Sequence, residues 1–121
     1  MKKLTPKSYW DNNTYNTDAV STKQGFWTQI IPKSFHTVDI NAKLQRYLKP
    51  GMSMLEIGVA PGLNSIAIAK EFGVVPHGMD YSEKGVAQAK RNFAAEGYYA
   101  KNVFLGDLFD AKIRAKHAGK Y

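Results

Sequence analysis

The chain has 121 residues, 44% of them hydrophobic and 22% charged, which is the composition of one small globular domain rather than of a disordered segment. It contains no cysteine, which excludes disulfide bonds and cysteine-ligated metal sites and fits the reducing environment of the cytoplasm. The net charge of +7 comes from 17 basic residues, 14 of them lysine, against 10 acidic ones, and it favours a lysine-rich solvated surface over a nucleic-acid interface.

The first segment of the chain, residues 1–36, is polar with embedded aromatic side chains. Residues 12–14, Asn-Asn-Thr, predict a turn, and Pro32 prevents a helix from continuing. The first residues lack the apolar core of a signal peptide, and no run reaches the length of a membrane span, so we expect no membrane partner and a cytoplasmic location. We therefore expect a leader over residues 1–36 and a folded domain over residues 37–121.

A helix and a strand follow the leader. Ser34 or Thr37 can cap a helix that runs to about Leu48, because apolar side chains recur there at the spacing of one helical face. Residues 49–51, Lys-Pro-Gly, end that helix in a turn. Residues 52–57 are apolar nearly throughout, which predicts a strand that is covered on both faces of a sheet.

A tight loop joins this strand to the next helix. Residues 54–62 read Met-Leu-Glu-Ile-Gly-Val-Ala-Pro-Gly, so an apolar run that contains an acid leads into a Gly-x-x-x-Gly loop. A helical pattern covers residues 63–72, and a second apolar run covers residues 74–79. Strand, turn and helix in this order bring a helix N-terminus close to a ligand. Asp80 lies 22 positions after Gly58, where an acid can accept hydrogen bonds from a ribose diol.

The remaining elements complete an α/β pattern. Ser82 can cap a helix that reaches residue 96, and Gly97 suits its C-terminal end. Residues 102–105 predict a third strand, and residues 108–118 predict one helical turn or a loop. The alternation predicts a Rossmann-like α/β fold with helices flanking a parallel sheet. Because a doubly wound sheet needs about five or more strands, we expect an incomplete fold that is truncated before its fourth strand.

The glycine spacing distinguishes two classes of ligand. A dinucleotide fingerprint needs Gly-x-Gly-x-x-Gly, but the three positions here are Gly58, Ala60 and Leu63. Pro61 also removes one N–H group that a phosphate could have used. An oxidoreductase that binds NAD is therefore the weaker interpretation of this loop.

Three segments carry the most informative motifs, namely residues 55–62 (LEIGVAPG), 78–82 (GMDYS) and 104–110 (FLGDLFD). In this order they resemble the motifs of the class I S-adenosylmethionine-dependent methyltransferases. The resemblance covers the first half of the family's domain. It implies an enzyme that binds S-adenosylmethionine, releases S-adenosylhomocysteine and methylates an unidentified acceptor. It also implies that residues 9–15 belong to a leader that folds over the cofactor as a lid, with simple packing of its aromatic side chains as the alternative.

The resemblance assigns cofactor binding to Glu56, Gly58, Ala60, Gly62, Asp80, Tyr81, Asp107 and Leu108. Close backbone approach at the two loop glycines suits the methionine end of the cofactor. Glu56 either attracts the ammonium group or fixes the loop by accepting N–H groups. Asp80 accepts from the ribose hydroxyls; its alternative role as a helix cap is one that Ser82 already fills.

The last three of these residues are assigned to the adenine. By the resemblance, Tyr81 packs near the ring, Asp107 accepts from the exocyclic amine and Leu108 offers a backbone N–H. Asp107 has the alternative of an ordinary turn after Gly106.

No catalytic residue is assigned, because acceptor-side residues of the resembling family usually follow the fourth strand. The three histidines show no metal-ligand spacing, so we expect no metal site. The acceptor and the oligomeric state are unassigned, and we expect the fragment alone to be inactive. Two further alternatives stay open: a non-catalytic module that keeps the fold for binding or scaffolding, and a nucleic-acid methyltransferase, suggested by the positive charge.

Overall fold

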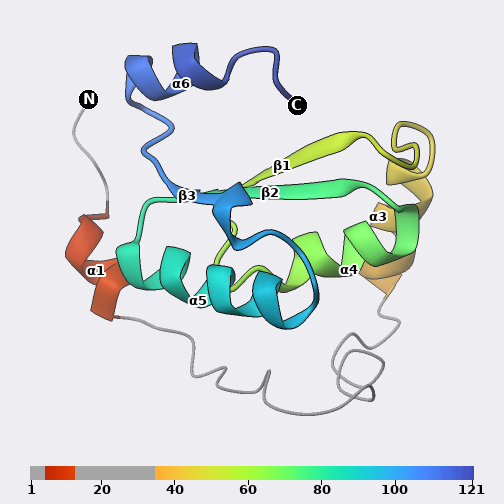
Figure 1. The fold of residues 1–121 in the computed structure, drawn as a ribbon, viewed down its shortest axis with the longest axis horizontal. Coiled ribbons are helices and arrows are strands. Elements are labelled where there is room, and N and C mark those ends of the chain that lie inside the picture. The colour runs from red at the N-terminus through yellow and green to blue at the C-terminus, as the bar shows by residue number, and fades with distance from the viewer. Residues whose placement is uncertain (1–4, 13–34) are drawn as a thin grey trace.

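The computed structural model describes residues 5–12 and 35–121, in which a small sheet lies between helices (Figure 1). The helices are α1 (Lys7–Asn12), α3 (Phe35–Leu44), α4 (Leu63–Phe72), α5 (Glu83–Ala95) and α6 (Ala111–His117). The strands are β1 (Ser53–Ile57), β2 (Val75–Asp80) and β3 (Val103–Leu105), and a short 3-10 turn, Ala100–Asn102, precedes β3.

The strands form one parallel sheet in the order β1-β2-β3, which confirms the predicted α/β class. β1 pairs with β2 from Ser53 opposite Val75 to Ile57 opposite Met79. Helices α4 and α5 lie on one side of the sheet, and α6 lies on the other (Figure 1). Because the strands run in the same direction, the loops that follow their last residues meet at one edge, which we call the carboxyl edge.

The core lies between the sheet and helices α4 and α5. The largest fully buried apolar side chains are those of Phe93, Ile66, Val59 and Val103. Ala89 of α5 is also fully buried in the same cluster. Burial of this apolar surface is the main stabilising contribution to a fold of this size. Val59 belongs to the loop after β1, so the loop is itself anchored in the core.

Strand β1 differs from the prediction, because only one of its faces is well covered. Ile57 is 53% exposed, and the three residues before it are only partly buried. On that face the described residues supply α6, which packs on β3 through a stack of His117 on Phe104. The prediction of a strand covered on both faces is therefore wrong for the described part of the chain.

Helix α3 ends earlier than predicted. It stops at Leu44, and the N–H groups of Tyr47 and Leu48 both turn back to the carbonyl oxygen of Leu44. Pro50 disfavours helical geometry in the residue before it, which limits how far the helix can extend. The predicted apolar face is also not buried, since Ile40 and Tyr47 are 50% and 72% exposed.

The segment after β3 is more ordered than the sequence predicted. Where we expected one helical turn or a loop, the chain forms the seven-residue helix α6. The side chain of Asp110 caps it by accepting the N–H of Lys112 at 2.8 Å. Basic residues in its last turn interact favourably with the helix dipole. Across residues 5–12 and 35–121, no helix has the length and apolar character needed to cross a membrane.

Candidate functional site

The loop after β1 is hydrogen-bonded to the end of β2. The N–H groups of Gly58 and Val59 both donate to the carbonyl oxygen of Met79, at 2.8 and 3.1 Å. The N–H of Ala60 donates to Oδ2 of Asp80 at 3.0 Å. These bonds bring the loop and Asp80 together at the carboxyl edge, where the sequence predicted both.

The rest of the loop has no N–H group to offer a ligand. Pro61 lacks the group, and the N–H of Gly62 donates to the carbonyl oxygen of Val59. All N–H groups from residue 58 to residue 62 are therefore used within the protein. A phosphate bound at a glycine-rich loop needs N–H groups that point at it, so this loop does not offer the anion site of a dinucleotide-binding protein.

Asp80 is held by hydrogen bonds to both of its carboxylate oxygens. Oδ2 accepts from Ala60, and Oδ1 accepts the N–H of Ser82 at 2.9 Å. Each oxygen keeps a second lone pair with which it can accept from a ligand. The Ser82 side chain caps α5 by accepting the N–H of Gly85 at 3.1 Å, as the sequence predicted.

Glu56 of β1 caps helix α4 from outside the helix. The N-cap residue, Gly62, has no side chain for this purpose. Instead, Oε2 of Glu56 accepts the N–H of Ser65 at 3.1 Å and also the Ser65 hydroxyl. Burial raises the pKa of Glu56, while hydrogen bonds from Ser65 and Asn64 act in the opposite direction. Glu56 thus fixes the loop, which was one of its two expected roles; contact with an ammonium group stays a prediction.

The two carboxylates give the carboxyl edge a negative character. Within residues 5–12 and 35–121, neither Glu56 nor Asp80 forms an ion pair; the pairs found there are Lys7–Glu83 and Lys70–Glu96. Such unpaired carboxylates are unusual in a chain whose net charge is +7. Two half-buried acids that have no cationic partner among the described residues suit a ligand that carries positive charge.

The two loop glycines are required for different reasons. Gly58 has φ +77°, and a Cβ built on it would meet no atom within 4 Å, so the space in front of it is open. Gly62 has φ +94°, and a Cβ there would lie 3.1 Å from the ring of Phe93 in α5. The space in front of Gly58 is thus open, and Gly62 lies against α5; close approach of a ligand to these two glycines stays a prediction.

Three residues that hold the loop were not assigned from the sequence. A Cβ on Gly85 would lie 2.8 Å from Cβ of Ala60, so the first turn of α5 can approach the loop only with glycine there. Asn92 of α5 donates from Nδ2 to the carbonyl oxygen of Pro61 at 2.8 Å. The third residue is Ser65. The sequence signal that could have identified Asn92 and Ser65 is a polar residue within an otherwise apolar helical face.

The residues assigned to the adenine also lie at the carboxyl edge. Tyr81 follows β2, and Asp107 and Leu108 follow β3. Oδ1 of Asp107 accepts the N–H of Phe109 at 2.9 Å, which is the turn that the sequence offered as an alternative. Leu108 is 41% exposed. Their contacts with an adenine ring stay predictions.

Helix α1 adjoins this edge. Asp11 accepts a hydrogen bond from the Ser82 hydroxyl at 2.7 Å, and Lys7 forms an ion pair with Glu83 at 2.6 Å. The bond to Ser82 lowers the pKa of Asp11. The leader predicted over residues 1–36 is thus described at residues 5–12, where it lies beside the start of α5. The rest of the predicted lid, including Tyr15, lies outside the described residues.

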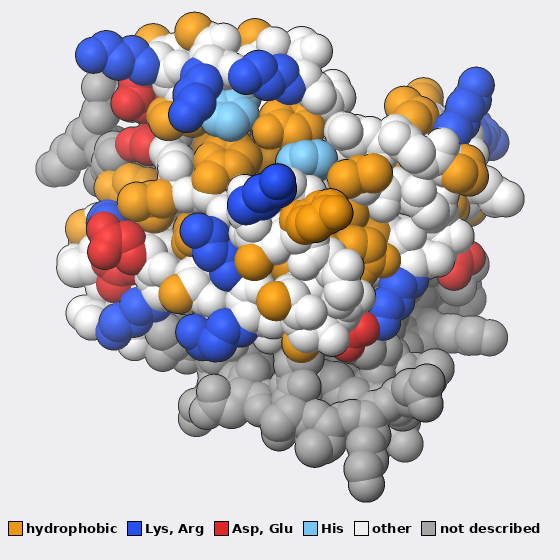
Figure 2. All heavy atoms as spheres, in the orientation of Figure 1, with side chains coloured by type: hydrophobic (Ala, Val, Ile, Leu, Met, Phe, Trp, Pro, Cys, Tyr) orange, Lys and Arg blue, Asp and Glu red, His pale blue; other side chains and the backbone are white. Residues whose placement is uncertain are grey.

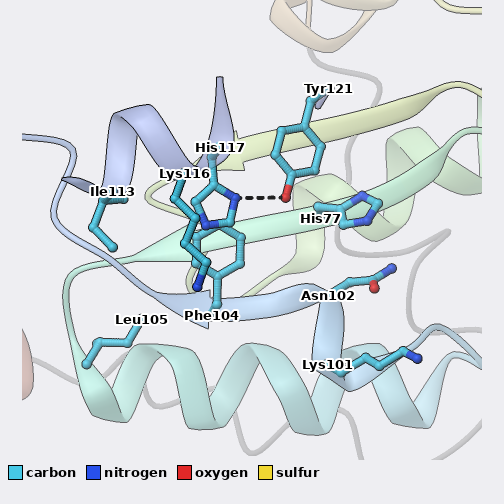
Figure 3. A pocket seen from close by; sticks show the side chains of 9 residues that line it. All are labelled: His77, Lys101, Asn102, Phe104, Leu105, Ile113, Lys116, His117 and Tyr121. Carbon is cyan, nitrogen blue, oxygen red and sulfur yellow. Dashed lines mark hydrogen bonds between the residues drawn. The ribbon is translucent and has the colours of Figure 1, made fainter. Parts of the chain in front are cut away.

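A separate pocket of about 300 Å³ lies on the α6 side of the sheet (Figure 3). Its lining residues are His77, Lys101, Asn102, Phe104, Leu105, Ile113, Lys116, His117 and Tyr121. The imidazole of His117 stacks on Phe104 with ring centroids 4.3 Å apart, and its Nδ1 lies 3.2 Å from the Tyr121 hydroxyl.

Figure 2 shows histidine and hydrophobic side chains gathered at this hollow, with Lys and Arg side chains around them. Burial lowers the pKa of His117, with smaller contributions from Lys120 and Lys116. None of the residues assigned to the cofactor lines this pocket, so its aromatic stack belongs to the packing of α6 on the sheet.

Comparison with known proteins shows which proteins share this fold. No protein-family model matches the chain. The solved structure of phosphoethanolamine N-methyltransferase 2 from Haemonchus contortus, in complex with phosphomonomethylethanolamine and S-adenosylhomocysteine, superposes over 86% of this chain with a TM-score of 0.53 and 24% identity. The match covers 24% of that protein.

Two curated sequences are similar to more than half of the chain. The ribosomal protein L11 methyltransferase of Dictyoglomus turgidum is 41% identical over 68 residues, which is 55% of this chain and 22% of the relative. The enzyme of the same name from Nitratiruptor sp. is 32% identical over 69 residues, which is 57% of this chain and 24% of the relative.

The chain is similar in sequence to part of two methyltransferases and shares the fold of a third. The Rossmann-like methyltransferase fold predicted from the three motifs is thereby confirmed, and the chain spans less than a quarter of the length of these two methyltransferase relatives.

Proposed function

We propose that this chain is the cofactor-binding part of an S-adenosylmethionine-dependent methyltransferase, whose intact form transfers a methyl group to an acceptor that is not identified. The observation that carries the proposal is the loop after β1. It presents two carboxylates, Glu56 and Asp80, and no available N–H group from residue 58 to residue 62.

Electrostatics favour this cofactor over NAD. S-adenosylmethionine carries a sulfonium and an ammonium group, which two neighbouring carboxylates attract. A pyrophosphate would be repelled by the same carboxylates and would find no N–H groups in the loop to neutralise it. The relation to methyltransferases supports the same choice.

The residues of the carboxyl edge fit the parts of the cofactor. Asp80 keeps lone pairs for the ribose hydroxyls, and the open space at Gly58 admits the methionine end. Tyr81, Asp107 and Leu108 are proposed for the adenine. The bound cofactor supplies an electrophilic methyl group for in-line displacement, so the protein's task is to position the acceptor and exclude water.

The acceptor is left open in this proposal. The two relatives are named for ribosomal protein L11, but the similarity covers only 68 and 69 residues, less than a quarter of each relative. No catalytic residue is proposed for the same reason. Because the chain has no cysteine, we propose the cytoplasm as its compartment.

The cofactor class is tested by calorimetric titration of the purified chain with S-adenosylhomocysteine, with NAD as the paired control. We expect heat of binding from S-adenosylhomocysteine and none from NAD, because the carboxylates of the loop can receive the ammonium group of the first ligand and repel the pyrophosphate of the second. Binding of NAD instead would overturn the proposal. Heat from neither ligand would also overturn the proposal that this chain is the cofactor-binding part of the enzyme.

Replacing Asp80 with alanine is expected to weaken S-adenosylhomocysteine binding roughly five- to hundredfold, through loss of a charged acceptor for the ribose. Asp110→Ala is the matched control, because Asp110 also accepts a backbone N–H but caps α6, on the other side of the sheet. The dissociation constant of S-adenosylhomocysteine from Asp110→Ala should equal that from the unmodified chain. An unchanged constant for Asp80→Ala would refute the ribose role.

A further inference from the structure

Ser65 is a polar residue in the buried face of α4. It is 0% exposed and lies next to Ile66, which is also fully buried. Its N–H and its hydroxyl both donate to the same oxygen of Glu56, Oε2, across nine positions of sequence. An alanine would fill the same space without the hydroxyl, so the helix does not need serine for packing. The hydroxyl matters through its bond to Glu56.

Glu56 is subject to opposing influences. Burial is the largest effect on its pKa and raises it, and the negative charge of Asp80 acts in the same direction. The Ser65 hydroxyl is the largest influence that lowers the pKa, followed by Asn64 and the Ser65 N–H. No lysine, arginine or histidine of the described residues forms an ion pair with Glu56. Its ionised form therefore depends on neutral donors from the first turn of α4.

Given the proposed function, on which this role depends, we propose that Ser65 is a positioning residue for the cofactor, because its two hydrogen bonds hold the Glu56 carboxylate at the loop, where it would receive the ammonium group of S-adenosylmethionine. The two bonds from Ser65 both end on Oε2, so neither occupies Oε1. Ser65 acts through Glu56 and touches no reacting atom.

The test is the pH dependence of S-adenosylhomocysteine affinity for Ser65→Ala in the full chain. Affinity that needs ionised Glu56 is present above the pKa of Glu56 and is lost as the pH falls through it. Without the hydroxyl the pKa rises, so the loss begins at a higher pH. We expect the two proteins to agree within about twofold at high pH, where Glu56 is ionised in both. We expect them to differ about fivefold or more over the pH range in which only Ser65→Ala has lost the charge of Glu56. A merely structural defect would lower affinity equally at every pH.

Two variants sharpen the comparison. Ser53→Ala makes the same chemical change at an exposed position of β1 and should leave the profile unchanged. Glu56→Gln keeps an acceptor for Ser65 but cannot ionise, so its affinity should be weak and flat across this pH range. Adding Ser65→Ala to Glu56→Gln should then produce no further pH dependence, as expected for two residues that act as one unit.

A second readout needs no ligand. The carboxyl carbon of Glu56 is titrated by NMR in the free chain, and Ser65→Ala should raise its midpoint. An unchanged midpoint would overturn the role of Ser65 whatever the ligand does. A raised midpoint with an unshifted affinity profile would overturn the link to the cofactor. Absence of S-adenosylhomocysteine binding by the unmodified chain at any pH would instead sink the proposed function, and with it the assignment of Glu56 to the ammonium group.

Discussion

Replacing Gly58 with valine is expected to abolish S-adenosylhomocysteine binding, with a loss of affinity of about a hundredfold or more. The open space in front of Gly58 is where we place the methionine end of the cofactor, and a branched side chain would fill it. The free chain should still fold, because a Cβ at this position meets no protein atom within 4 Å. Valine at φ +77° does strain the backbone, at a cost of about 1–3 kcal/mol of stability.

Gly97→Val separates these two effects. Gly97 has φ +81° and equally empty surroundings, but it lies at the end of α5, away from the loop. It should show the same loss of stability by thermal unfolding, with unchanged affinity by calorimetry. Retention of tight binding by Gly58→Val would mean that the ligand does not approach the loop at this residue.

Replacing Gly78 with alanine is expected to give the largest loss of stability among single substitutions at this sheet, about 3 kcal/mol in the free energy of unfolding. Gly78 lies in β2, and its Cβ would fall 2.5–2.7 Å from all three outer carbons of Val59. Val59 is 2% exposed and cannot move away without disturbing the core. Denaturant unfolding monitored by circular dichroism measures the change.

The matched control is Gly106→Ala. Its Cβ would approach Sδ and Cγ of Met79 at 2.6 and 2.8 Å, but the methionine side chain is unbranched and can rotate away, which Val59 cannot do. We expect a loss of about 1 kcal/mol or less. Adding Val59→Ala to Gly78→Ala should recover part of the lost stability, because it removes the atoms that clash. Equal losses for the two glycines, or no recovery in the double variant, would show that the collision with Val59 is not the cause.

The strand, loop and helix around the site could be predicted because their determinants are local. Residues 63–72 were expected to be helical, and α4 covers the same residues. The second strand was expected at 74–79 and is observed at Val75–Asp80. Once two parallel strands are placed, their ends must share an edge, so Glu56 and Asp80 were expected to lie close to the loop. The contacts of these residues with a cofactor remain predictions.

The rotation of α4 could not be predicted with the same certainty. The pattern places Leu63, Ile66 and Ala67 over the sheet and allows close approach at Ala69. Ile66 and Ala69 are buried as expected, but Leu63 and Ala67 are only partly buried, and the polar Ser65 is buried instead. A helix of ten residues with apolar side chains around much of its circumference has only a weak preference for one rotation. The hydrogen bond between Ser65 and Glu56 of β1 favours one of these rotations. A hydrogen bond between residues of two different elements produces no periodic pattern in the sequence, so it could not be predicted.

The burial of Val59 in the core has a consequence for the energetics of ligand binding. The loop is closed by its own hydrogen bonds before any ligand arrives, so its conformational entropy is lost when the chain folds rather than when the ligand binds. Affinity is then coupled to the stability of the core. A substitution that weakens the packing around Val59 would let the loop sample other conformations. It would lower the affinity for the ligand although the substituted residue does not contact the ligand, because part of the binding free energy would be needed to restore the loop conformation.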